Sequence, residues 1–309
     1  MLSKLDAHEE IDLRVVAGSP DAASGHAYDS EGYSFTRLEL GATKNALSKS
    51  PKAIWRIMQH IRFFRPDAVL MPMELKHASV IVPLAMLKKI YGFRLVSYNH
   101  SLEPRNPQQN RGRLRRTMMQ CLARRYDHVV FYSQASCDRS VAAKFVIAED
   151  SSFAENTLDV ESIRDGYDLR TQLGVPPTIL FIGRLLPQKG VTKLFDYYTE
   201  IKKRLPELRL EIIGDGPMRD FVSNITDADN SISWQGAVSV ESEIRAVMER
   251  SDIVMIPGET GLGVVHAFAY GKPYVTVDLP EINHGPEFDY LVDSENGFRL
   301  TGIVEDDAQ

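Results

Sequence analysis

Short apolar segments that alternate with amphipathic helical segments are the feature that most restricts the fold of this chain. The apolar segments are rich in Val, Ile and aromatic residues and end at Gly, Pro, Asn or Ser, as buried strands do. They cover residues 11–18, 68–73, 94–99, 128–133, 178–183, 208–216, 231–236, 252–258 and 273–278. Helical spacing covers residues 50–64, 78–92, 111–127, 190–206 and 241–251. This alternation predicts parallel sheets with helices on both faces, an α/β fold.

The chain is long enough for two such sheets. Its 309 residues suit two domains better than one core. A polar stretch over residues 154–180 ends in the rigid "GVPP" before a new strand, which is typical of a linker. We therefore predict domains over residues 1–160 and 161–309. Two doubly wound domains would face each other across a cleft, with ligands at the carboxyl ends of the strands.

Composition excludes several classes of protein. The hydrophobic fraction of 43% and the charged fraction of 25% are ordinary for a globular chain, so disordered and fibrous classes are excluded. Cys121 and Cys137 lack CxxC or Cys/His spacing, which predicts a reducing compartment and no structural zinc. No signal-peptide core and no apolar run of membrane-span length is found in the sequence, so we expect a cytoplasmic protein.

Positive charge is concentrated in one segment. Residues 44–125 hold 17 Lys and Arg against only Asp67, Glu74 and Glu103, whereas the whole chain has a net charge of −6. Such a segment attracts phosphates, nucleic acid or an anionic membrane. A solvated basic face is the alternative that the charge count alone leaves open.

The loop in "FIGRLLPQKGV", residues 181–191, carries two cations at the end of a predicted strand. Arg184 and Lys189 flank a proline, and Gly190 opens the next helix. A phosphate bound there would meet helix amides and two side-chain cations. The spacing is not that of a Walker loop. Cations that simply face solvent remain the alternative.

Two further glycine-rich loops follow predicted strands in the same half. In "IIGDGP" the glycines would let a ligand approach the backbone. We expect Asp215 to cap the next helix, and a direct contact with the ligand is the alternative. In "PGETGLGVVHAFAYG" the turn over residues 258–263 supplies free amides at a second predicted helix start. His266 falls within that helix, where a structural histidine is the simpler interpretation.

In their order and spacing, these loops resemble the donor-binding domain of GT-B glycosyltransferases, in particular glycosyltransferase family 4. The resemblance covers residues 178–300 and is carried by the segments "GRLLPQKG", "IIGDGP", "SWQG", "SDIVMIP", "ETGLGVVHAFAYGKP" and "GPEFDYLVDSENGF". The first half is similar more loosely, through "RPDAVLMPMEL", "FRLVSYNHS", "YDHVVFYS" and "NTLD".

The resemblance implies the GT-B fold, with two Rossmann-like domains, and a retaining transfer of sugar from a nucleotide-diphosphate donor to an acceptor hydroxyl. It implies no metal and no cofactor other than this nucleotide-sugar co-substrate. Arg184 and Lys189 match the family's catalytic cations, which contact the diphosphate. The implied donor-binding positions are Gly183, Gly214, Gly216, Gly258, Glu259, Gly261, Leu262, Gly263 and His266.

On the acceptor side, the resemblance implicates His100 in "SYNHS" near the transferred sugar, with a loop histidine that has no function as the alternative. Glu74 in "PMELKH" is a weaker candidate from its place after a strand. The family's paired glutamates fall on Gly258 and His266, and Glu259 is displaced by one position from the first. His266 has the hydrogen-bonding capacity to replace the glutamate that binds the ribose hydroxyls. By comparison with the family pattern, we expect the first domain to lack its first strand and the second to lack its closing helices.

The resemblance also gives the basic segment 44–125 a candidate partner. Relatives with lipid-linked acceptors use basic amphipathic helices of the first domain on the membrane, and "KSPKAIWRIMQHIRFFR" has this composition. We expect a glycan or lipid-linked acceptor, in surface polysaccharide or glycolipid synthesis, and a peripheral position on the inner face of the membrane. We expect no nucleic-acid partner, because no reading element or stacking platform is evident. Two alternatives are a sugar-nucleotide epimerase with the GT-B fold and a non-catalytic nucleotide-sugar-binding or partner subunit.

Overall fold

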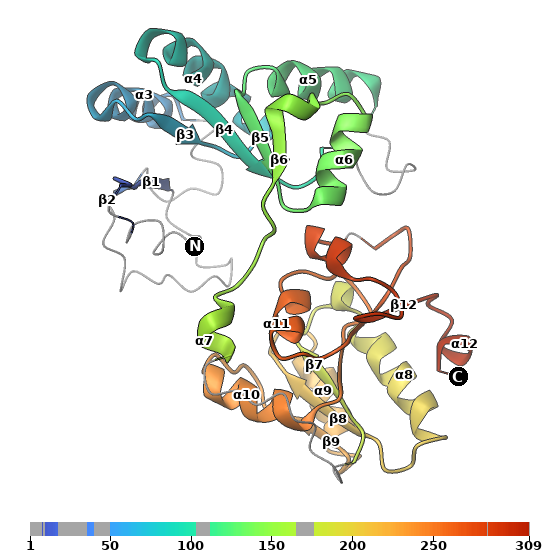
Figure 1. The fold of residues 1–309 in the computed structure, drawn as a ribbon. Coiled ribbons are helices and arrows are strands. Elements are labelled where there is room, and N and C mark those ends of the chain that lie inside the picture. The colour runs from blue at the N-terminus through green and yellow to red at the C-terminus, as the bar shows by residue number, and fades with distance from the viewer. Residues whose placement is uncertain are drawn as a thin grey trace. The chain divides into compact units, whose positions relative to one another are not determined.

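The chain forms two compact units (Figure 1), Met1–Ala154 and Glu155–Gln309. The boundary predicted at residue 160 falls on the first residue of the short helix α7 (Val160–Arg164) of the second unit. The structure, a computed structural model, describes residues 8, 10–17, 36–39, 50–102, 112–164, 176–282 and 284–308.

Unit 1 is built on a four-stranded parallel sheet with the order β3-β4-β5-β6. These strands are β3 (Ala68–Leu70), β4 (Arg94–Asn99), β5 (His128–Phe131) and β6 (Ser151–Phe153). Two more strands, β1 (Arg14–Ala17) and β2 (Thr36–Glu39), form a separate parallel pair. Sequence patterns predicted β1, β3, β4 and β5 but not β2 or β6.

Helices connect the strands of unit 1. They are α3 (Pro51–Phe64), α4 (Ala78–Tyr91), α5 (Arg113–Ala123) and α6 (Gln134–Ala142), with 3-10 turns η2 (Leu75–His77) and η4 (Ala148–Asp150). Helix α3 begins where Ser50 Oγ accepts a hydrogen bond from the Ala53 amide at 3.3 Å and Pro51 takes the first helical position. Ile81, Leu84, Leu95 and Phe131 form the fully buried centre of this unit.

Unit 2 is built on a six-stranded parallel sheet with the order β12-β11-β10-β7-β8-β9. The strands are β7 (Thr178–Ile182), β8 (Arg209–Ile213), β9 (Ile232–Trp234), β10 (Ile253–Met255), β11 (Tyr274–Val277) and β12 (Gly297–Leu300). All but β12 were predicted from the sequence.

The helices of unit 2 lie on both faces of its sheet. They are α7, α8 (Val191–Lys202), α9 (Arg219–Thr226), α10 (Glu241–Arg250), α11 (Gly263–Ala269) and α12 (Val304–Asp307), with η5 (Pro187–Lys189) and η6 (Pro286–Tyr290). The chain runs one way along the sheet from β7 to β9 and the other way from β10 to β12. Right-handed connections therefore place α8 and α10 on opposite faces, as Figure 1 shows.

This reversal creates a switch point between β7 and β10. In doubly wound sheets a crevice opens at the carboxyl ends of the strands at such a point. The loops that follow β7 and β10 are those with Arg184, Lys189 and the turn at residues 258–263. The α/β architecture with two parallel sheets agrees with the fold predicted from the sequence, and it places the motif-bearing loops together.

Candidate functional site

The loops after β7 and β10 pack closely against each other at two glycines, one in each loop. At Gly190 (φ 73°) a Cβ would lie 2.2 Å from the Pro257 carbonyl oxygen, and at Gly258 a Cβ would lie 2.4 Å from the Gln188 carbonyl oxygen. Only glycine permits backbones to approach so closely. The Glu259 amide also donates to the Gln188 carbonyl at 2.8 Å. The two loops that were predicted to bind an anion therefore lie in direct contact.

Lys189 is held within this contact. Its Nζ donates to the backbone oxygen of Glu259 at 2.6 Å, and its side chain is half-buried. Burial lowers the pKa of Lys189, and the nearby Arg184 lowers it further, whereas Glu259 and Glu287 raise it. Two carboxylates therefore partly offset the cost of keeping an ammonium group in this position.

Arg184 differs from Lys189 in its environment. It is exposed, and within the part of the chain that the structure describes its guanidinium makes no hydrogen bond or ion pair. The next residue, Leu185, is fully buried and its amide donates to the Asp215 carbonyl at 2.9 Å. Arg184 thus projects from an anchored backbone with all its donors available to an anion.

The glycines of "IIGDGP" pack against the same loop. A Cβ on Gly214 would lie 1.8 Å from the Gly183 carbonyl oxygen, and one on Gly216 would lie 2.6 Å from the Leu185 carbonyl oxygen. These two glycines therefore allow the loop after β8 to pack closely against the loop after β7. Whether they also approach a ligand stays a prediction.

Asp215 does not cap the next helix, which corrects the expectation from the sequence. Its Oδ1 accepts from the Gly216 amide at 2.7 Å, and its Oδ2 pairs with Arg219 at 3.0 Å. Helix α9 begins only at Arg219 and takes Met218 as its N-cap residue, without a side-chain cap. Asp215 lies three residues before this N-cap residue, and its carboxylate binds the Gly216 amide and Arg219 instead.

The turn over residues 258–263 packs against residues 284 and 285, at the start of the segment "GPEFDYLVDSENGF" that carries part of the family resemblance. The buried Thr260 donates its amide to His284 Nδ1 at 3.3 Å, and its carbonyl accepts from the Gly285 amide at 3.1 Å. Gly261 and the exposed Leu262 complete the turn, and Gly263 is the first residue of α11. The "GPE" motif was the only sequence signal for this contact.

His266 lies further along α11 and has a protein partner. Its Nε2 is 3.0 Å from Glu241 Oε1 on α10, and its side chain is 13% exposed. Tyr270, one turn later, donates to the same carboxylate at 2.5 Å. Glu241 therefore ties α11 to α10 through two side chains, and His266 has a structural role whether or not it also contacts a ligand.

In unit 1, Glu74 and His100 follow strands β3 and β4, as predicted. The exposed Glu74 pairs with Lys76 at 2.7 Å just before η2. His100 is exposed and lies edge-to-face against Tyr132, with ring centroids 4.7 Å apart. Both side chains lie beyond the carboxyl ends of parallel strands, where acceptor residues were expected.

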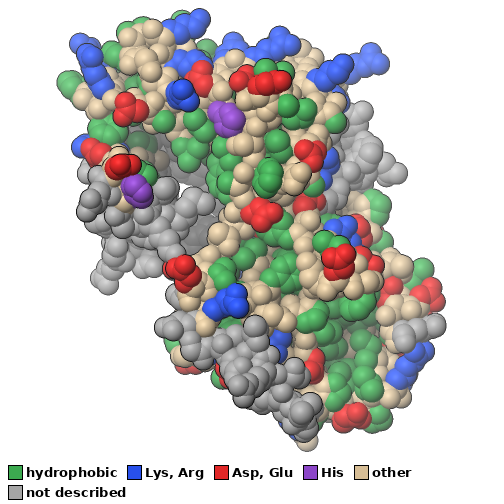
Figure 2. Space-filling model, viewed as in Figure 1, with side chains coloured by type: hydrophobic (Ala, Val, Ile, Leu, Met, Phe, Trp, Pro, Cys, Tyr) green, Lys and Arg blue, Asp and Glu red, His purple; other side chains and the backbone are tan. Residues whose placement is uncertain are grey.

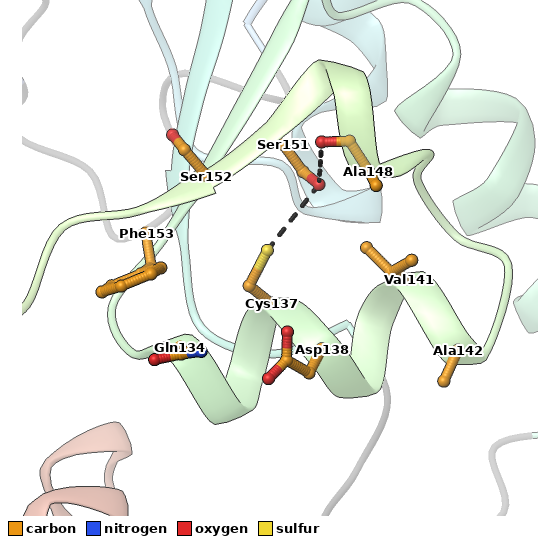
Figure 3. Close-up of a pocket in the computed structure, with 9 residues that line it drawn as sticks. All are labelled: Gln134, Cys137, Asp138, Val141, Ala142, Ala148, Ser151, Ser152 and Phe153. Carbon is orange, nitrogen blue, oxygen red and sulfur yellow. Dashed lines mark hydrogen bonds between the residues drawn. The ribbon is translucent and has the colours of Figure 1, made fainter.

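A separate pocket of about 570 Å³ lies between α6 and β6 of unit 1 (Figure 3). Cys137 and Ser151 face each other in it, with the thiol 3.7 Å from the hydroxyl. None of the predicted site residues lines this pocket.

Among the described residues, no group of His, Cys, Asp and Glu is arranged to hold a metal ion. In the same ranges, no helix combines the length and the apolar character of a membrane span.

Comparisons with known families match both halves of the chain. The family described as "Glycosyl transferase 4-like domain" matches residues 2–150, and "Glycosyl transferases group 1" matches residues 176–303. A GDP-mannose-dependent alpha-(1-6)-phosphatidylinositol monomannoside mannosyltransferase of Mycolicibacterium smegmatis is 29% identical over 120 residues. That alignment covers 34% of this chain and 31% of the relative, so the chain spans about a third of that protein.

Solved structures support the fold. The lipopolysaccharide outer core galactosyltransferase WaaB superimposes with a TM-score of 0.63 and 18% identity, over 89% of this chain and 73% of that one. Alr3699/HepE of Anabaena, in complex with UDP, superimposes with a TM-score of 0.60 and 21% identity. The superposition covers 88% of this chain and 74% of that one. With two family matches that together span residues 2–150 and 176–303, this chain belongs to the group 1, family 4-like glycosyltransferases of the GT-B fold.

Proposed function

We propose that unit 2 binds the diphosphate of a nucleotide sugar and that the protein transfers the sugar, with retention and without a metal, to an acceptor hydroxyl. The observation that carries this proposal is the contact between the β7 and β10 loops, which places Lys189 against the glycine turn beside the exposed Arg184. UDP is bound in the Anabaena neighbour, which supports a nucleoside diphosphate as the ligand.

The charges of this site fit the chemistry of a departing diphosphate. As the glycosidic bond breaks, negative charge grows on the phosphate oxygens, and fixed donors stabilise that charge most strongly where water is excluded. Arg184 offers a planar set of donors and Lys189 a compact ammonium group. Within the described residues the amides of Gly258, Glu259 and Thr260 already donate to protein acceptors, so the amides of Gly261, Leu262 and Gly263 are the ones in this turn that would add further donors. The leaving phosphate would itself assist deprotonation of the acceptor, as the family resemblance implies.

For the acceptor we propose a glycan or a lipid-linked glycan, with His100 and Glu74 on the acceptor side. The mannosyltransferase relative is named for a phosphatidylinositol acceptor, which favours the lipid-linked class. A protein that modifies such an acceptor must reach the membrane surface, so we place it in the cytoplasm, peripheral to the inner face of the membrane. Nucleic acid has no part in this proposal.

The surface of unit 1 fits a membrane. Ala53, Ile57 and Ile61 of α3 face the core, while the other side of this helix exposes Trp55 (61%) and Phe63 (81%). Lys and Arg side chains gather around α3, α4 and α5, with apolar side chains between them (Figure 2). Further exposed apolar side chains there are Met86, Ile90, Leu114 and Met118. Apolar and basic residues together are what an anionic lipid surface binds. Residues 44–49 and 103–111 of the basic segment lie outside the described residues.

The proposal is tested by calorimetric titration with UDP, GDP, ADP and their sugars, followed by turnover assays with the donor that binds. Binding of one diphosphate sugar and its consumption only with an acceptor is the expected result. Conversion of the donor without an acceptor would indicate the epimerase alternative, and binding without turnover would indicate the non-catalytic subunit. If no nucleoside diphosphate binds, the donor-site assignment is wrong.

A further inference from the structure

Asn156, at the beginning of unit 2, makes two hydrogen bonds to η6. Its Nδ2 donates to Glu287 Oε1 at 2.6 Å, and its backbone amide donates to the Tyr290 hydroxyl at 2.8 Å. The two partners lie more than 130 residues further along the chain. Asn156 therefore ties the segment that enters unit 2 to the segment next to the glycine turn.

Glu287 is a carboxylate in an enclosed position, with 3% of its surface exposed. Space for it exists because residue 285 has no side chain: a Cβ there would lie 2.6 Å from Glu287 Oε2. Burying a carboxylate is costly unless hydrogen bonds or a cation compensate it. Asn156 supplies the hydrogen bond to one oxygen, and Lys189 is the cation whose charge interacts with Glu287.

From Glu287 the contacts continue to the turn. Gly285, two residues earlier, donates its amide to the Thr260 carbonyl at 3.1 Å. His284 Nε2 lies 2.9 Å from the Val277 carbonyl, an acceptor, so Nε2 carries the proton and Nδ1 accepts from the Thr260 amide. The next residue before Thr260 is Glu259, whose carbonyl holds the Lys189 ammonium.

We propose that Asn156 and Glu287 are positioning residues that hold the glycine turn and the Lys189 ammonium in the geometry that binds the donor diphosphate. Neither residue needs to touch the ligand. The inference rests on the proposed donor site, and it adds two residues outside the loops that follow β7 and β10.

Electrostatics distinguishes this role from a purely structural one. The groups that face Lys189 are Glu259, Glu287 and Arg184, and the two carboxylates raise the pKa of the ammonium while burial and Arg184 lower it. Removing the charge of Glu287 therefore lowers the pKa of Lys189 further. A smaller fraction of the protein then carries the ammonium at alkaline pH, and diphosphate affinity is lost at a lower pH than in the wild type.

The test is a calorimetric titration of the whole chain. UDP and GDP are first tried on the wild type, and the nucleotide that binds is then titrated into each variant from pH 7 to pH 10. Glu287→Gln keeps the shape and an acceptor for Asn156 but removes the charge, and we expect its alkaline loss of affinity to begin at lower pH. Asn156→Ala removes the hydrogen bond, and we expect its Kd to rise about tenfold at pH 7, the scale of one charged hydrogen bond. Tyr290→Phe replaces Asn156→Ala if the latter does not fold.

Glu211→Gln is the matched control. Glu211, on β8, is also a mostly enclosed carboxylate of unit 2. It pairs with Arg250 at 3.0 Å. Its substitution is expected to lower thermal stability without changing the affinity or its pH profile. If Glu287→Gln and the folded Asn156 or Tyr290 variant bind the diphosphate as the wild type does at every pH, the proposal is overturned. Failure of the wild type to bind either diphosphate would instead refute the donor site itself.

Discussion

Gly190 packs against Pro257 so closely that a Cβ at residue 190 would come within 2.2 Å of the Pro257 carbonyl oxygen. Gly190 also has a positive φ of 73° and is the N-cap residue of α8. The contact fixes the distance between the loop with Lys189 and the loop with the glycine turn. Any side chain at residue 190 must therefore separate the two halves of the proposed donor site.

Gly190→Ala is expected to destabilise unit 2 by more than about 2 kcal/mol, since the left-handed conformation and the clash both oppose alanine. Urea unfolding measures this. Gly236→Ala is the matched control, because Gly236 has nearly the same φ of 71° but open space around it. Its cost should reflect the backbone conformation alone, about 1 kcal/mol. Equal costs for both variants would show that the contact with Pro257 is unimportant.

Arg184→Ala and Lys189→Ala are expected to lower kcat/KM by on the order of 100-fold or more, as loss of one fixed donor to a developing anion does. Only Lys189→Ala should also lower the melting temperature, because Lys189 bonds to the Glu259 carbonyl whereas Arg184 is exposed. Arg209→Ala, at the amino end of β8, is the control for loss of an exposed arginine. Wild-type kinetics in the Arg184 variant would contradict the diphosphate site.

Trp55→Ser with Phe63→Ser is expected to reduce flotation with vesicles that contain anionic lipid, because both side chains are exposed on the side of α3 that faces away from the core. Stability should change little, since both side chains are more than half exposed. Binding should also weaken as salt is raised. Phe298→Ser removes an exposed aromatic side chain of unit 2 and serves as the control. If the wild type does not float at low salt, the membrane surface proposal is wrong.

The ion pair of Lys202 with Asp229 predicts a specific loss of stability in acid. Hydrogen bonds from Lys202 and Ser231 lower the pKa of Asp229 to about 2. Because the unfolded value is about 4, the stabilisation is complete above pH 4 and is lost as the pH falls toward 2. Asp229→Asn should therefore cost up to about 1 kcal/mol at pH 7, a limit set by solvent screening, and nothing near pH 2. Asp227→Asn, at an exposed neighbouring position, is the control for the loss of a carboxylate at pH 7.

Tyr274→Phe is expected to keep or raise the stability of unit 2. Tyr274 is fully buried, and its hydroxyl has no hydrogen-bond partner within the described ranges. An enclosed hydroxyl without a partner costs about 1–3 kcal/mol, so its removal should be neutral or favourable. Burial and the charge of Glu287 raise the pKa of this phenol well above its usual value, so it stays neutral. A clear fall in the melting temperature of the variant would show that the Tyr274 hydroxyl makes a stabilising hydrogen bond.

Sequence patterns predicted most strands of both units, because central parallel strands are buried on both faces and therefore read as apolar runs. The strands they missed include β6 and β12, which lie at sheet edges and carry polar or exposed residues such as Ser152 and Phe298. Helix α6 was missed because its nine residues are too short and too polar for a clear helical period. Elements at the edge of a sheet are partly exposed to solvent, so their sequences contain fewer of the regularly spaced apolar residues by which buried elements are recognised.

For the proposed site, the sequence by itself singled out Arg184, Lys189 and the glycine turn as candidates, because each loop follows a strand and carries its own local pattern. Only the tertiary structure decided that Lys189 is held by the Glu259 carbonyl and that Asp215 binds Arg219 rather than capping a helix. It also decided that Asn156 and Glu287, 131 residues apart, share a hydrogen bond. The physical reason is that strand order brings distant segments together, and no local spacing encodes which distant backbone a side chain will meet.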